Sequence, residues 1–228
     1  MEYASIAFSS GLLLCYTMTM SSRTIFDQNA ERYEAWFLEN PHAYVSELHA
    51  VRELLPRGSG LEIGVGTGRF AAPLGIGRGV EPSRPMAELA RRKGIEVTPG
   101  VAEHLPFSDS EFDFCLMVTT ICFLDDIDLS FNEARRVLRP GGAFVIGFVD
   151  RESPLGKEYL QRKDGSVFYQ KATFHTAGEI VSHLDRAGFT DPLFRQTLFR
   201  PLGELTGPEP VREGHGDGSF VVVRAVKR

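Results

Sequence analysis

The segment Leu61-Glu62-Ile63-Gly64-Val65-Gly66-Thr67-Gly68 carries a hydrophobic strand directly into a turn with three alternating glycines. Because glycine has no Cβ, such a turn can adopt positive φ values and lie very close to a ligand. We therefore predict that the turn opens an α/β fold and that its backbone contacts a nucleoside.

The spacing of these glycines disfavours a dinucleotide. A dinucleotide-binding turn needs G-x-G-x-x-G, in which the last glycine packs a helix on the strand beside a pyrophosphate. Here the third glycine falls one residue early and Arg69 follows it. Glu62, inside the strand, would repel a phosphate but can hold a cationic amine. We therefore keep an NAD(P)-dependent oxidoreductase as an alternative function and not as the leading one.

Three further segments follow: a short strand that ends in an acid, a turn before an apolar strand, and a glycine turn. They are Gly77-Arg78-Gly79-Val80-Glu81-Pro82-Ser83, residues 100–109 leading to Phe112-Asp113, and Leu138-Arg139-Pro140-Gly141-Gly142. With the first turn, these segments resemble in order the motifs of class I S-adenosylmethionine-dependent methyltransferases, in particular the small-molecule enzymes of type 11. The resemblance covers most of the chain.

The resemblance implies a cofactor, S-adenosyl-L-methionine (SAM), whose product is S-adenosyl-L-homocysteine (SAH). Glu81 would accept hydrogen bonds from both ribose hydroxyls. Val101 stands where many relatives have an aspartate for the adenine amine, so that bond must come from Glu103, from backbone, or not form. The residues implied for the cofactor are Tyr33, Glu62, Gly64, Val65, Gly66, Gly68, Glu81, Pro82, Met86, Val101, Ala102, Glu103 and Thr119.

The acceptor side is less defined. The segment from Phe26 to Tyr33 is similar to the lid helix of small-molecule methyltransferases, and we expect the remaining walls to come from residues 150–173. The expected substrate-pocket residues are Trp36, Phe37, Thr120 and Cys122. Transfer to a small-molecule acceptor would be an in-line displacement that needs orientation rather than covalent catalysis. The methylated atom stays open among nitrogen, oxygen, carbon, sulfur and a metalloid.

The sequence does not define a general base. One is needed only if the acceptor arrives protonated, and His175 is the candidate. Cys122 is a poorer nucleophile, because a thiol between Ile121 and Phe123 should have a raised pKa. A non-catalytic SAM-binding regulatory domain is a third interpretation, which Val101 leaves open.

Composition limits the partners. A chain of 228 residues with net charge -5 and a pI near 5.7 fits one α/β domain without an electrostatic footprint for nucleic acid. The three cysteines, Cys15, Cys115 and Cys122, are odd in number and lack metal-ligand spacing. We expect a cytoplasmic monomer or homodimer with a small-molecule acceptor, no metal, no nucleic acid and no membrane.

Residues 1–20 are apolar in part, yet Glu2 stands where a signal sequence needs positive charge. We interpret them as a leader or a misplaced start, since Met18 and Met20 precede a plausible beginning. Residues 21–228 are expected to form a single methyltransferase domain, with residues 21–41 as the lid region.

Helical and strand patterns alternate beyond residue 22. Helices are predicted at 29–40, 42–55, 129–138, 176–187 and after Ser83, which could cap its helix. Strands are predicted at 61–64, 79–81, 95–98, 112–118, 143–148, 192–199 and 219–226. The alternation predicts a Rossmann-like, doubly wound α/β sheet of seven strands, mostly parallel, with an antiparallel last strand and N-terminal lid helices. In such sheets ligands bind at the carboxyl ends of the strands.

Overall fold

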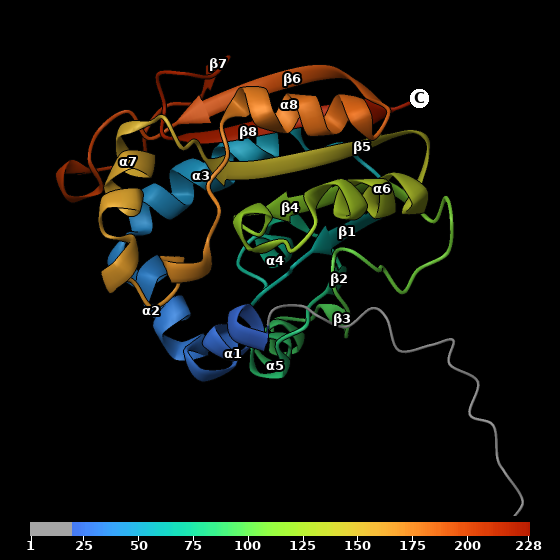
Figure 1. Ribbon diagram of the computed structural model, residues 1–228, viewed down its shortest axis with the longest axis horizontal. Helices are drawn as coiled ribbons and strands as arrows, with labels where there is room; N and C mark the ends of the chain where they lie inside the picture. Colours follow the sequence, from blue (N-terminus) through green and yellow to red (C-terminus); the bar gives the residue numbers. More distant parts are fainter. Residues whose placement is uncertain (1–19) are drawn as a thin grey trace, which may run out of the picture.

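The computed structural model describes residues 20–228. The expected leader and Cys15 lie outside these residues, apart from Met20, which begins the first helix. Helices cover both faces of a central sheet (Figure 1).

The sheet has eight strands and is mostly parallel. Strands β1 to β5 pair in parallel, whereas β8 is antiparallel to both of its neighbours, β5 and β6. This confirms the predicted Rossmann-like sheet, and the added strand is the two-residue β7. The sheet order is β3 (Glu96–Thr98), β2 (Arg78–Val80), β1 (Gly60–Ile63), β4 (Phe112–Val118), β5 (Leu138–Val149), β8 (Phe220–Lys227), β6 (Phe189–Thr197) and β7 (Arg212–Glu213).

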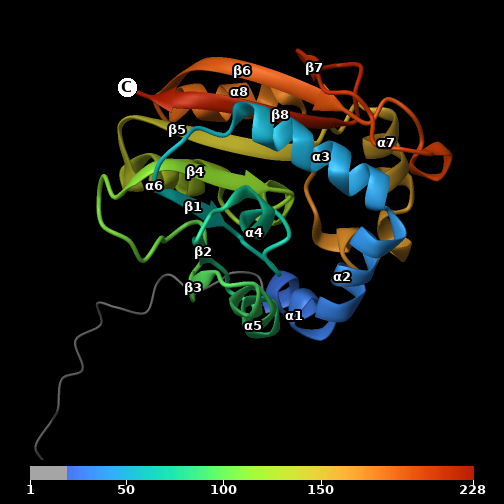
Figure 2. The same ribbon diagram turned by 180° about the vertical axis from the view of Figure 1, so that it is seen from behind.

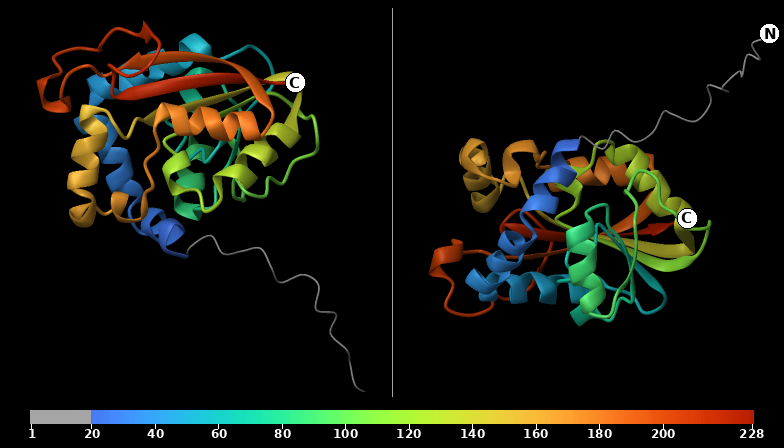
Figure 3. Two further views of the ribbon diagram at one scale, coloured as in Figure 1. Left: turned by 45° about the horizontal axis from the view of Figure 1, so that its top comes forward. Right: turned by 90° about the horizontal axis from the view of Figure 1, so that it is seen from below.

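The helices form a layer on each face and a group at one end. One face carries α6 (Ile127–Val137) and α8 (Ala177–Arg186), and the other carries α3 (Pro41–Leu54), α4 (Ala71–Leu74) and α5 (Arg84–Arg92) (Figures 1 and 2). Beyond the carboxyl ends of the parallel strands lie α1 (Met20–Gln28), α2 (Ala30–Glu39) and α7 (Pro154–Gln161) (Figure 3). Short 3-10 helices are η1 (Ile121–Phe123), η2 (Lys163–Gly165), η3 (Tyr169–Lys171) and η4 (Leu202–Glu204).

No helix within residues 20–228 is both long enough and apolar enough to cross a bilayer.

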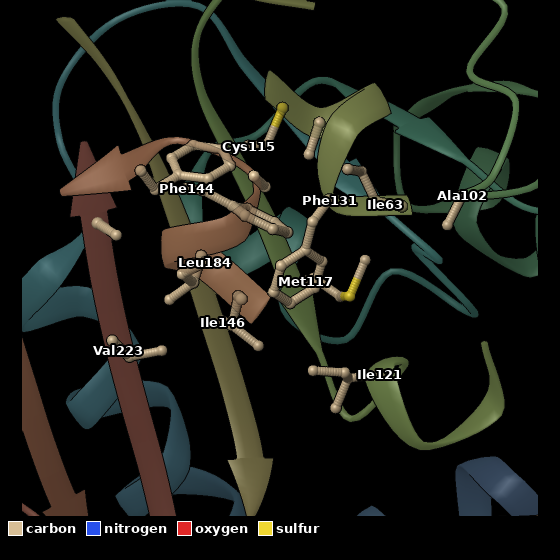
Figure 4. Close-up of a cluster of buried hydrophobic side chains, with 14 of the residues drawn as sticks. Ile63, Ala102, Cys115, Met117, Ile121, Phe131, Phe144, Ile146, Leu184 and Val223 are labelled. Atoms are coloured by element: carbon tan, nitrogen blue, oxygen red, sulfur yellow. The ribbon is translucent and has the colours of Figure 1, made fainter. Parts of the chain in front are cut away.

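The core lies on both sides of β4, because successive side chains of a strand point to opposite faces. Met117 packs with α6 and α8, whereas Leu116 packs with α3. Figure 4 shows Phe131 of α6 beside Met117 and Ile146, and its ring meets the Phe144 ring edge-on at 5.2 Å between centroids. Coverage on both faces explains the near-continuous apolar run that predicted this strand.

Three local expectations need correction. The segment from Arg139 to Gly142 does not separate helix from strand, because β5 begins at Leu138. Gly141 has φ +77° there, and the β4–β5 register shifts between Phe112 and Phe114, so the glycines form an irregularity within the pairing. The lid segment is two helices, separated at Asn29, rather than one.

Contrary to the expectation from the sequence, Ser83 does not cap its helix through its side chain. It occupies the N-cap position of α5, but within the described residues its hydroxyl caps no backbone amide. Its own N–H instead donates to Glu81 Oε1 at 2.9 Å. The residue therefore fixes the end of β2 to the start of the helix through its backbone.

Replacing Phe131, which is fully buried, should test this core. Phe131→Ala removes a large side chain from a packed interior, so the free energy of unfolding in urea should fall by about 3–5 kcal/mol. Leu129→Ala on the same helix is the control, because Leu129 is 42% exposed and should change stability by less than about 0.5 kcal/mol. Equal losses in the two variants would contradict the packing described here.

Candidate functional site

Two adjoining cavities lie at the carboxyl ends of the parallel strands. The smaller has a volume of about 80 Å³ and the larger about 440 Å³. Four side chains belong to both walls, namely Phe26, Tyr33, Thr119 and Phe123. They come from α1, from α2 and from the segment after β4, which brings distant parts of the sequence to one place.

The smaller cavity collects most of the residues predicted to bind a cofactor. Its wall contains Phe26, Tyr33, Gly64, Gly66, Val80, Glu81, Pro82, Met86, Gly100, Val101, Ala102, Glu103, Val118, Thr119, Thr120, Phe123 and Leu124. Of the predicted cofactor residues, Glu62, Val65 and Gly68 are not among the described residues that line either cavity.

The three glycines of the β1 turn all have positive φ, but the atoms that a Cβ would meet differ from one glycine to the next. A Cβ built at Gly64 would lie 2.5 Å from Thr120 Oγ1, and one at Gly68 would lie 2.4 Å from Ile95 Cδ1. At Gly66 the nearest atoms are 3.6 Å away, Met86 Cε and Tyr33 Oη. Gly66 therefore faces the open cavity, whereas the other two glycines admit protein side chains.

Val65 has a similar packing role. A Cβ at Gly79 of the neighbouring strand would lie 2.6 Å from Val65 Cβ, so the valine fills space over β2. Val65 is 3% exposed and belongs to the core on the α3 side of the sheet. Val65 therefore holds the turn in place by packing against β2.

Glu81 connects the ends of two strands. Its Oε2 accepts a hydrogen bond from the Gly66 N–H at 2.9 Å, and its Oε1 accepts from the Ser83 N–H at 2.9 Å. Burial raises the pKa of this carboxyl to about 7, against the opposing effect of the two amides. Each carboxylate oxygen has two lone pairs, so acceptor capacity for a ligand remains on the cavity side.

Glu62 is a second buried acid beside the turn, 2% exposed. Burial raises its pKa well above the usual range, the Ala71 amide opposes that shift, and the Glu81 charge adds to it. Among the described residues, none donates a hydrogen bond to Glu62 Oε2. A buried oxygen without a partner needs a donor, and a cationic ligand supplies the best one.

Val101, Ala102 and Glu103 line the smaller cavity. Glu103 Oε1 accepts from the amides of Asp125 and Asp126, at 2.9 and 3.4 Å, which ties this turn to the N-terminus of α6. Met86, only 2% exposed, lines the same cavity from α5.

The larger cavity is mainly aromatic. Of the predicted substrate-pocket residues, Trp36, Phe37 and Cys122 line it, as does His175, whereas Thr120 lines the smaller cavity instead. The described residues that line it are Phe26, Arg32, Tyr33, Ala35, Trp36, Phe37, Glu39, Glu47, Phe70, Thr119, Ile121, Cys122, Phe123, Phe148, Val149, Tyr159, Ser166, Phe168, Tyr169, Phe174 and His175.

Burial shifts the pKa values of the two reactive side chains of this cavity, His175 and Cys122, in opposite directions. Burial lowers the pKa of His175, while Glu179, whose Oε2 lies 3.9 Å from Nδ1, partly opposes the shift. Burial raises the pKa of Cys122 to about 12, and its thiol donates to the Thr119 carbonyl at 3.3 Å. At neutral pH the histidine is a neutral imidazole and the cysteine is a protonated thiol.

The sequence reasoning missed Glu47, which lines the larger cavity from α3. A signal for it exists: Glu47 shares a helix face with Tyr44, three residues before it, and Val51, four residues after it. An acid on the apolar face of an amphipathic helix is either paired or functional. Residues 150–173 supply part of this wall as expected, but Tyr159, Phe168 and Tyr169 were not identified individually, since nothing in their spacing marks them.

Comparisons with known proteins agree with this geometry. A family model described as "Methyltransferase domain" matches residues 61–146. An uncharacterised protein of Methanocaldococcus jannaschii is 44% identical over 203 residues, which are 89% of this chain and 98% of that protein.

Two solved structures extend the comparison. One from Thermotoga maritima, described as a SAM-dependent methyltransferase and possible histamine N-methyltransferase, has a TM-score of 0.89 and 53% identity, covering 90% of this chain and 99% of its own. Phosphoethanolamine N-methyltransferase 2 of Haemonchus contortus with SAM shares the fold, at TM-score 0.62 and 18% identity, over 88% of this chain and 57% of its own. Together with the glycine turn and Glu81, these likenesses show that the chain belongs to the class I SAM-dependent methyltransferases.

Proposed function

We propose that this SAM-dependent enzyme transfers the methyl group to a small molecule bound in the larger cavity, while the smaller cavity holds the adenosyl part of SAM. The observation that carries the proposal is that the two cavities share four side chains. Two ligands in adjoining cavities can bring a methyl carbon and a nucleophile into contact, and proximity of that kind supplies much of the catalysis.

The residues of the smaller cavity fit SAM. Both Glu81 oxygens are fixed by amides and keep lone pairs for the two ribose hydroxyls. Gly66 leaves space that a Cβ would occupy. Glu62 is not part of the described wall of that cavity, but its Oε2, without a donor among the described residues, is the acceptor that we assign to the ammonium group of the methionine part.

The adenine end is assigned to Val101, Ala102 and Glu103, with Pro82 and Met86 beside them. Val101 and Met86 offer apolar surface to the ring, and the Ala102 backbone amide is a donor for a ring nitrogen. Glu103 is partly committed to the backbone of Asp125 and Asp126. Adenine recognition in this chain therefore depends more on shape and backbone than on a side-chain carboxylate.

When bound, SAM supplies an electrophilic methyl group on a sulfonium, which leaves as a neutral thioether in an in-line displacement. The protein's part is to orient the reactants and to exclude water. Tyr33 belongs to both walls, and burial together with four nearby glutamates raises its pKa, so it stays a neutral phenol. Its ring and that of Trp36 can stabilise a cation near the transfer point.

The volume of the larger cavity supports a small acceptor. About 440 Å³ lies within the range of about 300–1,000 Å³ that small-molecule sites occupy. The 53% identical protein of Thermotoga maritima, described as a possible histamine N-methyltransferase, also supports a small acceptor. SAH formation on incubation with SAM and a panel of amines, phenols, thiols and carboxylic acids tests the proposal directly.

Glu81→Ala should weaken cofactor binding. It removes the acceptors of the ribose hydroxyls, and loss of bonds to a charged group should raise the Kd for SAH at least about tenfold in calorimetry. Glu88→Ala is the control, because Glu88 is an acid exposed on α5 that pairs with Arg84. Unchanged SAH affinity in a folded Glu81→Ala protein would refute the assignment, as would calorimetry showing NAD bound in preference to SAM.

Trp36→Ala should affect the acceptor and not the cofactor. Trp36 lines only the larger of the two cavities among the described residues, so its loss should raise the acceptor KM at least about tenfold. SAH affinity should stay within about twofold, well under the tenfold that 1.4 kcal/mol represents. Leu38→Ala on the same helix is the control, since Leu38 is 73% exposed. Loss of SAH affinity in Trp36→Ala alone would contradict the division of the two cavities.

A further inference from the structure

Glu47 differs from the other acids near Tyr33. The hydroxyl of Tyr33 experiences the charges of Glu62, Glu81, Glu34 and Glu47. Glu34 forms ion pairs with Arg69 at 2.6 Å and with Lys93 at 3.2 Å. Glu81 accepts two backbone amides, and Glu62 interacts with the Ala71 amide.

Glu47 has no such partner. It is 4% exposed, lines the larger cavity, and within the described residues no group donates a hydrogen bond to it or forms an ion pair with it. Burial alone raises its pKa to about 8. A buried carboxyl without a partner is costly, and such groups in native proteins usually have a ligand or a function.

The surroundings of Glu47 are aromatic. Its charge acts on Tyr33, Tyr159 and Tyr169, and the rings of Tyr159 and Tyr169 stack at 4.6 Å between centroids. Among residues 24–228, whose side chains the structure describes, the basic ones lining the cavity are Arg32, which is exposed, and His175, whose pKa is lowered by burial. A carboxyl among ring faces with no buried cation beside it is a site for an ammonium group.

We infer that the methyl acceptor is an amine on an aromatic or apolar body, and that Glu47 binds its ammonium group in the larger cavity. The inference rests on the proposed function, because it takes that cavity as the acceptor's place. A carboxylate or phosphate acceptor would disfavour the ionised form of Glu47 further, and a neutral acceptor would bring no charge to stabilise that form. An ammonium group supplies both the charge and the donors. Before transfer it gives one proton to the Glu47 carboxylate, and the nitrogen lone pair so freed forms the bond to the methyl carbon as the bond from that carbon to the sulfonium breaks and SAH leaves.

The test uses the full chain with SAM and three probes: histamine, 2-phenylethylamine and its neutral counterpart 2-phenylethanol. Wild-type protein should methylate at least one amine, and Glu47→Gln, which keeps the side-chain shape, should lower kcat/KM for it at least about thirtyfold. SAH affinity should not change. Glu53→Gln is the matched control, since Glu53 lies on the same helix, is exposed, is not among the described residues that line either cavity, and its replacement should cost less than about twofold.

Binding separates this inference from the proposed function. Titration of the SAH complex with the two amines and the alcohol should show amine binding in wild type, a loss of at least about thirtyfold in Glu47→Gln, and weaker binding of the alcohol. Amine binding that depends on Glu47 without any turnover would support the ammonium site and count against methyl transfer. Turnover or binding of amines that Glu47→Gln leaves intact would overturn the inference, as would methylation of only the alcohol.

The Tm distinguishes this role of Glu47 from a merely structural one. If Glu47 only stabilised the fold, replacing it would lower the Tm. The raised pKa means that this carboxyl's contribution to stability is full below about pH 4 and is lost as the pH rises through about 8. Tyr33, Tyr159 and Tyr169, which face it from α2, α7 and η3, have raised pKa values and stay neutral over that range. The Tm of ligand-free Glu47→Gln, relative to the Tm of wild type, should therefore rise as the pH is increased from 6 to 8.5. A Tm that falls relative to wild type over this range would overturn the inference.

Discussion

The site depends on one bridge, the Glu81 carboxylate between the N–H groups of Gly66 and Ser83. These two amides belong to the loops after β1 and β2, which are neighbouring parallel strands. A carboxylate that accepts from both fixes the distance between the loops at the sheet edge where ligands of this fold class bind. The bridge exists because Gly66 adopts a positive φ of +54°, which turns its N–H toward the acid.

Buried acids set the electrostatics of the site. Glu81, Glu62 and Glu47 are all buried, and burial raises the pKa of each. Three acids whose ionised forms are disfavoured by desolvation favour a ligand that carries positive charge. A ligand with a sulfonium and an ammonium group, and an acceptor with a second ammonium group, would supply that charge. Binding energy and the relief of desolvation then favour the same ligands.

Much of the cofactor side was predictable because its residues are close in sequence to strand ends. The Gly64 to Gly68 turn, Glu81 and Val101 each follow a recognisable strand, and parallel strands bring their carboxyl ends together whatever lies between them. The distinct tasks of the three glycines were not predictable. Whether a missing Cβ admits Ile95, Thr120 or a ligand depends on neighbours distant in sequence.

The acceptor side was only partly predictable for a related reason. Trp36, Phe37 and Cys122 were expected there, but Thr120 turned to the smaller cavity, one residue after the shared Thr119. At the end of β4 the backbone leaves the strand with Thr119 at φ +51°, so the alternation of side chains no longer indicates where each points. Tyr159 and Tyr169 lie in short helical segments whose packing, not whose pattern, brings them to Glu47.

The shared wall links the two ligands. Phe26 meets Phe123 edge-on at 5.0 Å and stacks on Phe168 at 5.5 Å between centroids, so α1 contacts both the segment after β4 and the segment before η3. Phe26 and Phe123 line both cavities, whereas Phe168 lines the larger. Aromatic rings packed in this way cannot move independently, because a shift of one opens a gap beside the next. A ligand that displaced Phe26 in the smaller cavity would therefore change the shape of the larger cavity as well.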